Sequence, residues 1–160
     1  MFDLKLIKTI SISLIFILIT VVNANAQSPV EFKKSTIEIK TNKGDYTFLV
    51  ELALSPSQKS YGLMYRQSMP ENHGMLFIYD KPQVATMWMK NTYIPLDMVF
   101  IKSDGIIENI IQRTTPHSLD VLSATNKVRS VLELNAGTIS KLGIKAGDEV
   151  IHDIFVNRNK

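Results

Sequence analysis

Short segments that alternate apolar and polar residues, or run apolar for a few positions, recur along this chain between turn-forming residues. Such segments form strands, because successive side chains of a strand point to opposite faces of a sheet. The predicted strands cover residues 36–40, 46–54, 75–79, 85–90, 97–102, 106–112, 128–133 and 149–156. Asn42-Lys43-Gly44-Asp45 and Asp104-Gly105 are typical hairpin turns. The pattern predicts a mainly β fold, an antiparallel sandwich or barrel.

Two short helices are expected between the strands. Ser55 suits an N-cap, Pro56 suits the first helical position, and Gln58 can complete a capping box. This helix should run to about Arg66. Asn135 could cap a second helix that ends at Gly143.

The first 26 residues have the layout of a signal peptide. Lys5 and Lys8 precede an apolar run over residues 9–22, and Ala24-Asn25-Ala26 offers a cleavage site. The run is shorter than the roughly 20 apolar residues that span a bilayer, which favours cleavage over an uncleaved anchor. The expected mature protein begins at Gln27, with a flexible lead-in over 27–35 and one β domain over 36–156.

Composition narrows where the protein acts and which chemistry it uses. The chain has no cysteine, which excludes a lipid anchor at the cleavage site, thiol catalysis and thiolate metal sites. The formal charge is +3, and it falls to +2 without Lys5, Lys8 and Asp3. A charge this small gives no support to binding of nucleic acid. We expect an exported, soluble protein, periplasmic or secreted, with no stable membrane anchor after cleavage.

The most informative segment runs from Thr86 to Phe100. If residues 92–95 form a four-residue loop, the flanking strands form a hairpin in which Lys90 faces Asp97. Alternation then places Met87, Met89, Met98 and Phe100 on one face, which we expect to be core. The other face carries Trp88, Lys90, Asp97 and Val99.

Two interpretations fit the face with Trp88. In the first, Lys90 and Asp97 form an exposed cross-strand ion pair and the indole simply covers the sheet. In the second, Trp88 is a stacking surface for an apolar or sugar-like ligand that the two charged groups orient. An ion pair lowers the pKa of the acid and weakens it as a general base, which favours binding over catalysis on this face.

Other site chemistries have weaker patterns. Six methionines follow the predicted signal peptide, Met64, Met69, Met75, Met87, Met89 and Met98. Thioethers bind copper(I), so a copper(I) carrier is a further hypothesis. The hairpin places three of them with Phe100, where methionine is an ordinary packing residue. The three histidines are widely separated, so no zinc site is expected. No Gly-x-Ser-x-Gly nucleophile elbow occurs.

Four segments of the chain carry a family resemblance. They are Tyr61-Gly62-Leu63-Met64-Tyr65-Arg66, Gly74-Met75-Leu76-Phe77, the stretch Trp88-Met89-Lys90-Asn91-Thr92 with Ile94-Pro95-Leu96-Asp97, and Val131-Leu132-Glu133-Leu134-Asn135-Ala136-Gly137. In this order they resemble the bacterial and archaeal domain of unknown function 192 family, over residues 37–155. The resemblance implies a compact, mainly antiparallel β domain of jelly-roll or barrel-like type and no established reaction. Lys59-Ser60 stands where the family often has an arginine, and Tyr65 where phenylalanine is usual.

The resemblance adds Arg66, Glu133 and the turn Asn91-Thr92 to the candidate region. They could equally serve the fold, with Glu133 satisfying Arg66 or backbone donors near Gly137. The candidate ligand-binding residues are Arg66, Trp88, Lys90, Asn91, Thr92, Asp97 and Glu133. The leading hypothesis is a non-enzymatic envelope protein that binds a small molecule or another envelope protein, without a cofactor. The alternative is a hydrolase or lyase acting on an envelope polymer, with Asp97 or Glu133 as acid or base.

Overall fold

A computed structural model describes residues 30–155 of the chain. The predicted signal peptide lies outside the described residues, so it stays a prediction. Within residues 30–155, no helix is long and apolar enough to cross a membrane.

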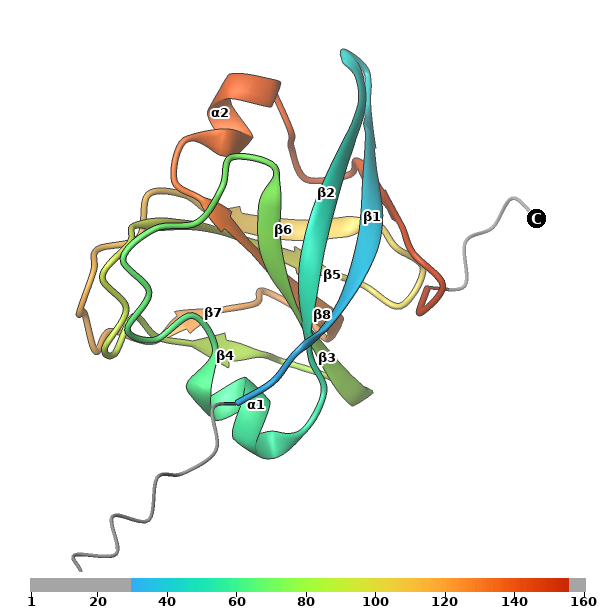
Figure 1. The fold of residues 1–160 in the computed structure, drawn as a ribbon. Coiled ribbons are helices and arrows are strands. Elements are labelled where there is room, and N and C mark those ends of the chain that lie inside the picture. The colour runs from blue at the N-terminus through green and yellow to red at the C-terminus, as the bar shows by residue number, and fades with distance from the viewer. Residues whose placement is uncertain (1–29, 156–160) are drawn as a thin grey trace, which may run out of the picture.

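Most strands belong to one seven-stranded sheet, which Figure 1 shows as a strongly curled surface. Its strands, in spatial order, are β6 (Ile107–Ile111), β5 (Leu96–Ile101), β8 (Val128–Asn135), β3 (His73–Gln83), β2 (Gly44–Ala53), β1 (Lys33–Thr41) and β9 (Glu149–Ile151). Neighbouring strands are antiparallel except β2 and β3, which are parallel. The prediction of a mainly antiparallel β fold with two short helices is therefore confirmed.

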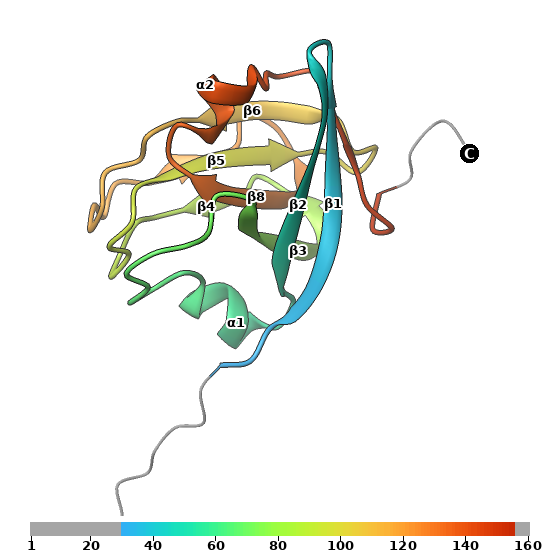
Figure 2. The ribbon, with the colours of Figure 1, turned by 45° about the horizontal axis from the view of Figure 1, so that its top comes forward.

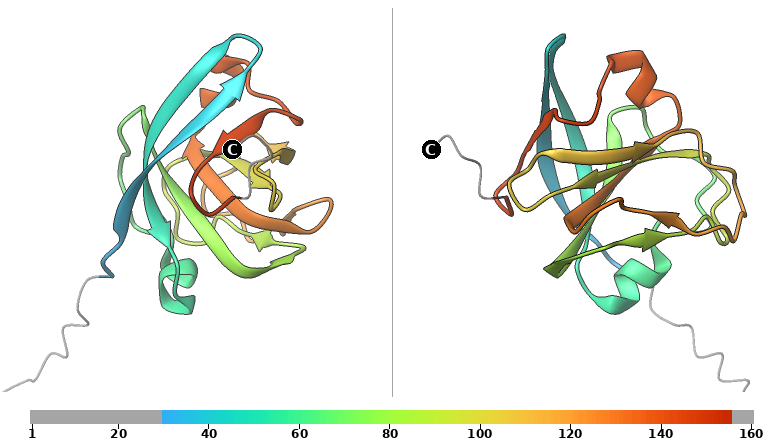
Figure 3. Two further views of the ribbon diagram at one scale, coloured as in Figure 1. Left: turned by 90° about the vertical axis from the view of Figure 1, so that its right-hand side faces the viewer. Right: turned by 180° about the vertical axis from the view of Figure 1, so that it is seen from behind.

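The two edges of the sheet meet at one end. Ile106, just before β6, forms an isolated antiparallel bridge with Glu149 of β9. The backbone N–H of Ile107 also donates to Asp148 at 2.9 Å. Figure 3 shows how the sheet curls until its two edge strands, β6 and β9, come together, so the fold is barrel-like at this end.

The opening hairpin and the first helix follow the local sequence closely. Thr41 pairs with Gly44 across the predicted turn. Ser55 accepts from the Gln58 backbone N–H, and the Gln58 amide oxygen accepts from the Ser55 N–H, which confirms the capping box. Helix α1 (Pro56–Tyr61) nevertheless ends before the predicted Arg66. Gly62 has φ of 51° and its N–H donates to Gln58, a geometry that stops the helix.

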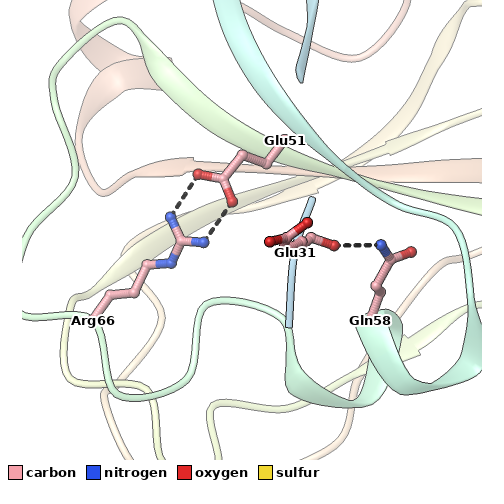
Figure 4. A network of polar contacts seen from close by, with 4 residues as sticks. All are labelled: Glu31, Glu51, Gln58 and Arg66. Carbon is pink, nitrogen blue, oxygen red and sulfur yellow. Dashed lines mark hydrogen bonds and ion pairs between the residues drawn. The ribbon is translucent and has the colours of Figure 1, made fainter. Parts of the chain in front are cut away.

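Several other boundaries differ from prediction. β1 begins at Lys33, inside the expected lead-in, and Figure 4 shows Gln58 donating to the Glu31 carbonyl just before it. Helix α2 (Thr138–Leu142) ends before Gly143 as predicted, but its N-cap is Gly137. Asn135 instead closes β8, and its side chain donates to the Met69 carbonyl at 2.9 Å.

The sheet buries both of its faces. Inside the curl, alternate residues of the central strands, such as Leu76, Val99 and Leu132, form one apolar core. The residues between them, such as Met75 and Met98, form a second core on the outer face. Helix α1 and β4 (Thr86–Met87) lie beside this outer face, and α1 is at the opposite end of the molecule from α2 (Figure 2).

The predicted central hairpin is wrong. β4 pairs with β7 (Leu122–Ser123) in a separate two-stranded sheet. Both edges of β5 are occupied, one by β6 and the other by β8, so no edge is left for residues 86–90. The predicted core residues nevertheless share the outer core, with Met89, Met98 and Phe100 buried and Met87 packed against them.

Candidate functional site

The site is built around Glu133, which lies in the C-terminal half of β8. In the sheet, Glu133 pairs with Met75 of β3 on one side and with Met98 of β5 on the other. Both methionines are fully buried in the outer core, and only 4% of Glu133 is exposed. The carboxyl therefore rises from an apolar surface at the centre of the sheet.

Nothing in the described part of the chain neutralises this carboxyl. Across residues 30–155, no hydrogen bond or ion pair to the Glu133 side chain is formed. Burial disfavours the charged form and raises the pKa of Glu133 to about 8. A buried acid without a partner usually marks a place where a ligand or a reaction supplies one.

Glu133 lines a cavity of about 480 Å³ between the outer face of the sheet, α1 and the segment around Trp88. Apolar side chains form much of its wall, namely Leu63, Met64, Phe77, Met87 and Val121. Five residues that carry hydroxyl groups also line it, namely Ser60, Tyr61, Tyr79, Thr86 and Thr92. This volume and this mixture of groups are typical of small-molecule sites.

Two ammonium groups lie over aromatic rings of the cavity wall. Lys90 Nζ is 5.3 Å from the centroid of the Trp88 ring, and Lys59 Nζ is 5.3 Å from that of Tyr79. Trp88 is 48% exposed, so its indole faces solvent as well as the cavity. Burial, with a smaller contribution from the charge of Glu133, raises the pKa of Tyr79 to about 12, which keeps its hydroxyl protonated.

Asp97 lies outside this cavity and does not contact Lys90, contrary to the predicted ion pair. It is fully buried, and its carboxylate accepts three backbone N–H groups. The Arg113 N–H donates to Oδ1 at 2.8 Å, while those of Gly137 and Ile139 donate to Oδ2 at 2.9 and 3.0 Å. Asp97, rather than Glu133, thus satisfies the donors near Gly137. Asp97 joins β5 to the end of β6 and the start of α2.

Arg66 also lies outside the cavity. Its guanidinium forms a two-pronged ion pair with Glu51 of β2, with N–O distances of 2.8 and 2.6 Å (Figure 4). The hydrogen bonds from Arg66 lower the pKa of Glu51, and those bonds raise the pKa of Arg66. The hypothesis that Glu133 satisfies Arg66 is therefore wrong. Arg66 fastens the segment after α1 to the sheet.

Asn91 and Thr92 form backbone hydrogen bonds with two other loops, those that contain Tyr65 and His117. Asn91 and Tyr65 both have positive φ, 55° and 64°, and the Tyr65 N–H donates to the Asn91 carbonyl at 2.9 Å. The Asn91 amide also donates to the Tyr65 hydroxyl. The carbonyl of Thr92 accepts from the N–H of His117, a third residue with positive φ. These hydrogen bonds hold the loops that contain Tyr65, Asn91 and His117 together.

The structure thus brings four of the seven candidate residues to one cavity, Trp88, Lys90, Thr92 and Glu133. Arg66, Asn91 and Asp97 fix the surrounding segments instead. Sequence reasoning did not select Lys59 and Tyr79, which complete the wall. Tyr79 could have been found, because it continues the outward alternation of Met75 and Phe77 along β3.

Methionines surround the site, but few of them reach the cavity. Met75, Met89 and Met98 are buried in the outer core, while Met64 and Met87 line the cavity. The Met87 sulfur accepts a hydrogen bond from the Tyr79 hydroxyl at 3.6 Å. Within residues 30–155, no three His, Asp or Glu side chains lie close enough together to hold a metal ion.

Comparison with known proteins agrees with the fold and the motif segments. A crystal structure described as a "putative transcription regulator" from Sinorhizobium meliloti 1021 is 46% identical, with a TM-score of 0.74. The match covers 76% of this chain and 95% of that one. A protein of unknown function from Novosphingobium aromaticivorans DSM 12444 is 35% identical, with a TM-score of 0.75, covering 78% of this chain and 89% of its own.

Among curated proteins, none matches the chain. The model of the family DUF192, described as an uncharacterized ACR, matches residues 37–152. This match confirms the resemblance inferred from the four motif segments. The chain therefore belongs to the domain of unknown function 192 family.

Proposed function

We propose that the protein binds a small organic ligand in the cavity that Glu133 and Trp88 line. The observation that carries this proposal is the Glu133 carboxyl, buried among apolar side chains and lacking a hydrogen-bond partner in the described chain. A ligand that supplies that partner recovers the free energy lost on burying the group. The apolar wall would hold the body of such a ligand, and the hydroxyl groups would orient it.

A carboxylate-dependent hydrolase is the second candidate function. It is supported by the same acid, because a carboxyl with a pKa near 8 can act as a general acid at neutral pH. Glycoside hydrolysis commonly uses two carboxyl groups that flank the bond. Glu133 is the single acid among the described residues that line the cavity, which favours binding over this reaction.

The fluorescence of Trp88 offers a direct test, because it is the only tryptophan of the chain. N-phenyl-1-naphthylamine is a neutral, apolar dye that absorbs where tryptophan emits. We expect saturable energy transfer from Trp88 to the dye. Ser60→Phe should weaken binding at least about tenfold, because the larger side chain on the cavity wall would occupy part of the cavity. Ser57→Phe is the matched control, since Ser57 is exposed on the same helix and lies outside the wall.

The outcomes separate the two candidates. Saturable transfer that Ser60→Phe weakens and Ser57→Phe preserves supports the binding site, and absence of saturable transfer contradicts it. Release of nitrophenolate from 4-nitrophenyl butyrate, lost in Glu133→Gln, would instead establish the hydrolase. The same substitution keeps the size of the side chain, so a loss of turnover would report on its acid chemistry.

We also propose that the protein acts after export, in the periplasm or outside the cell. The support is the sequence of residues 1–26, with its two lysines, its apolar run and Ala24-Asn25-Ala26. N-terminal sequencing of the protein from its native host should begin at Gln27. A chain that keeps Met1 would contradict export by this route.

A further inference from the structure

The charges around the cavity narrow the class of ligand, provided that the proposed binding function is correct. Lys59 and Lys90 contribute two ammonium groups to the wall, and Glu133 is the one acid among its described residues. Even when Glu133 is ionised, positive charges exceed negative ones. A cavity with this balance attracts an anion more strongly than a cation.

Both ammonium groups lack a carboxylate partner. In the described part of the chain, three ion pairs form, and none includes Lys59 or Lys90. Each instead lies over an aromatic ring of the wall, which positions it beside the cavity. An anionic group bound at either lysine would complete a contact that the protein itself leaves open.

The interior of the cavity suits a different part of the same ligand. Leu63, Phe77 and Met87 line it, and they can enclose an alkyl or aryl body. Glu133 lies on the sheet between two buried methionines. Among the described residues its carboxyl forms no ion pair with either lysine, so a ligand can contact the lysines and the acid with different groups.

We propose that the natural ligand is an amphipathic organic carboxylate. Its carboxylate binds Lys59 and Lys90, and its apolar body lies against Leu63, Phe77 and Met87. A hydroxyl or amide group on that body forms the hydrogen bond with Glu133. A cationic amphiphile is the competing class, because an ammonium group could reach the Glu133 carboxyl instead. The two classes predict opposite selectivity for ligands that share one alkyl chain.

Displacement of N-phenyl-1-naphthylamine by octanoate, 1-octanol and octylamine measures this selectivity. At about pH 6.5 octanoate is an anion and octylamine is a cation. We expect octanoate to bind about tenfold more tightly than 1-octanol, and octylamine to bind most weakly. The double variant Lys59→Gln with Lys90→Gln should reduce the ratio of octanol to octanoate dissociation constants to about one. Lys40→Gln, on β1 and outside the cavity wall, should leave this ratio unchanged.

Each remaining outcome contradicts a defined part of the proposal. If octylamine binds more tightly than octanoate, the ligand class is wrong while the binding site stands. If the double variant keeps the wild-type ratio, or if Lys40→Gln changes it equally, recognition by Lys59 and Lys90 is wrong. If the dye binds but none of the three compounds displaces it, the amphipathic class fails. If the dye does not bind at all, the proposed binding function fails with it.

Discussion

Two buried acids of this protein have opposite surroundings. Asp97 is fully buried and accepts three backbone N–H groups, so its charge is well solvated by the protein. Glu133 is almost as buried, but its neighbours in the sheet are Met75 and Met98. Burial alone therefore predicts neither role, and the number of donors around each carboxyl distinguishes the structural acid from the candidate binding group.

Asp97→Asn should destabilise the fold. An amide has one acceptor oxygen instead of two, and its NH₂ group would face backbone N–H groups that the carboxylate now satisfies. We expect the free energy of unfolding to fall by about 2 to 4 kcal/mol, measured by urea denaturation near neutral pH.

Asp80→Asn is the matched control, because Asp80 is exposed on β3. Its unfolding free energy should stay within about 0.5 kcal/mol of the wild-type value. An Asp97→Asn protein as stable as this control would show that the three backbone bonds contribute little to the fold.

Among single residues, the sequence predicts buried positions better than it predicts partners. Met87, Met89, Met98 and Phe100 share one apolar core as predicted, although the hairpin that grouped them does not form. Within β5, alternation depends only on local geometry and correctly placed Met98 and Phe100 together. The pairing of Lys90 with Asp97 depended on an assumed register and was wrong. The partner of Arg66 is Glu51, on a strand whose position relative to Arg66 no local pattern defines.

At the scale of elements, local signals predicted the turns and caps, while strand order could not be read from them. The capping box at Ser55 and the turn at Asp104-Gly105 involve neighbours in sequence, and both form. The hairpin over residues 86–100 failed because β8, which follows later in the chain, occupies one edge of β5. Competition between distant strands for one edge has no local sequence signal.

Gly74 is a motif residue that the close packing of two strands requires. It lies on β3 beside β8, and a Cβ atom there would come within 2.6 Å of the Glu133 carbonyl oxygen. The glycine therefore allows the close approach of the two strands. The sequence marked this residue through the family resemblance, but the contact that requires it became visible in the structure.

At the scale of the whole molecule, the fold separates two tasks. The end with α2 closes the sheet through the Ile106–Glu149 bridge, and Asp97 anchors α2 to β5 (Figures 1 and 3). The end with α1 contributes Lys59, Ser60 and Tyr61 to the cavity over the outer face. The curled sheet thus supports the cavity with a stable core on its other side.

Four of the seven candidate residues meet at this cavity. The hairpin register that suggested Trp88 and Lys90 is wrong, and the family resemblance added Thr92 and Glu133. The aromatic and cationic residues of the segment around Trp88 are the basis for the candidate binding surface. The acid that completes it comes from β8 instead of β5. Only the order of strands in the folded sheet places Glu133, rather than Asp97, beside that segment.

The central claim is that the Glu133 carboxyl is desolvated and unpaired on the cavity wall, and its own titration tests this most directly. Carbon-13 NMR of the side-chain carboxyl can follow its ionisation, with Glu133→Gln assigning the signal. Because burial penalises the charged form, the group should keep its proton at neutral pH and lose it with a midpoint of about 8. A midpoint near 4.5, the ordinary value for glutamate, would contradict the account.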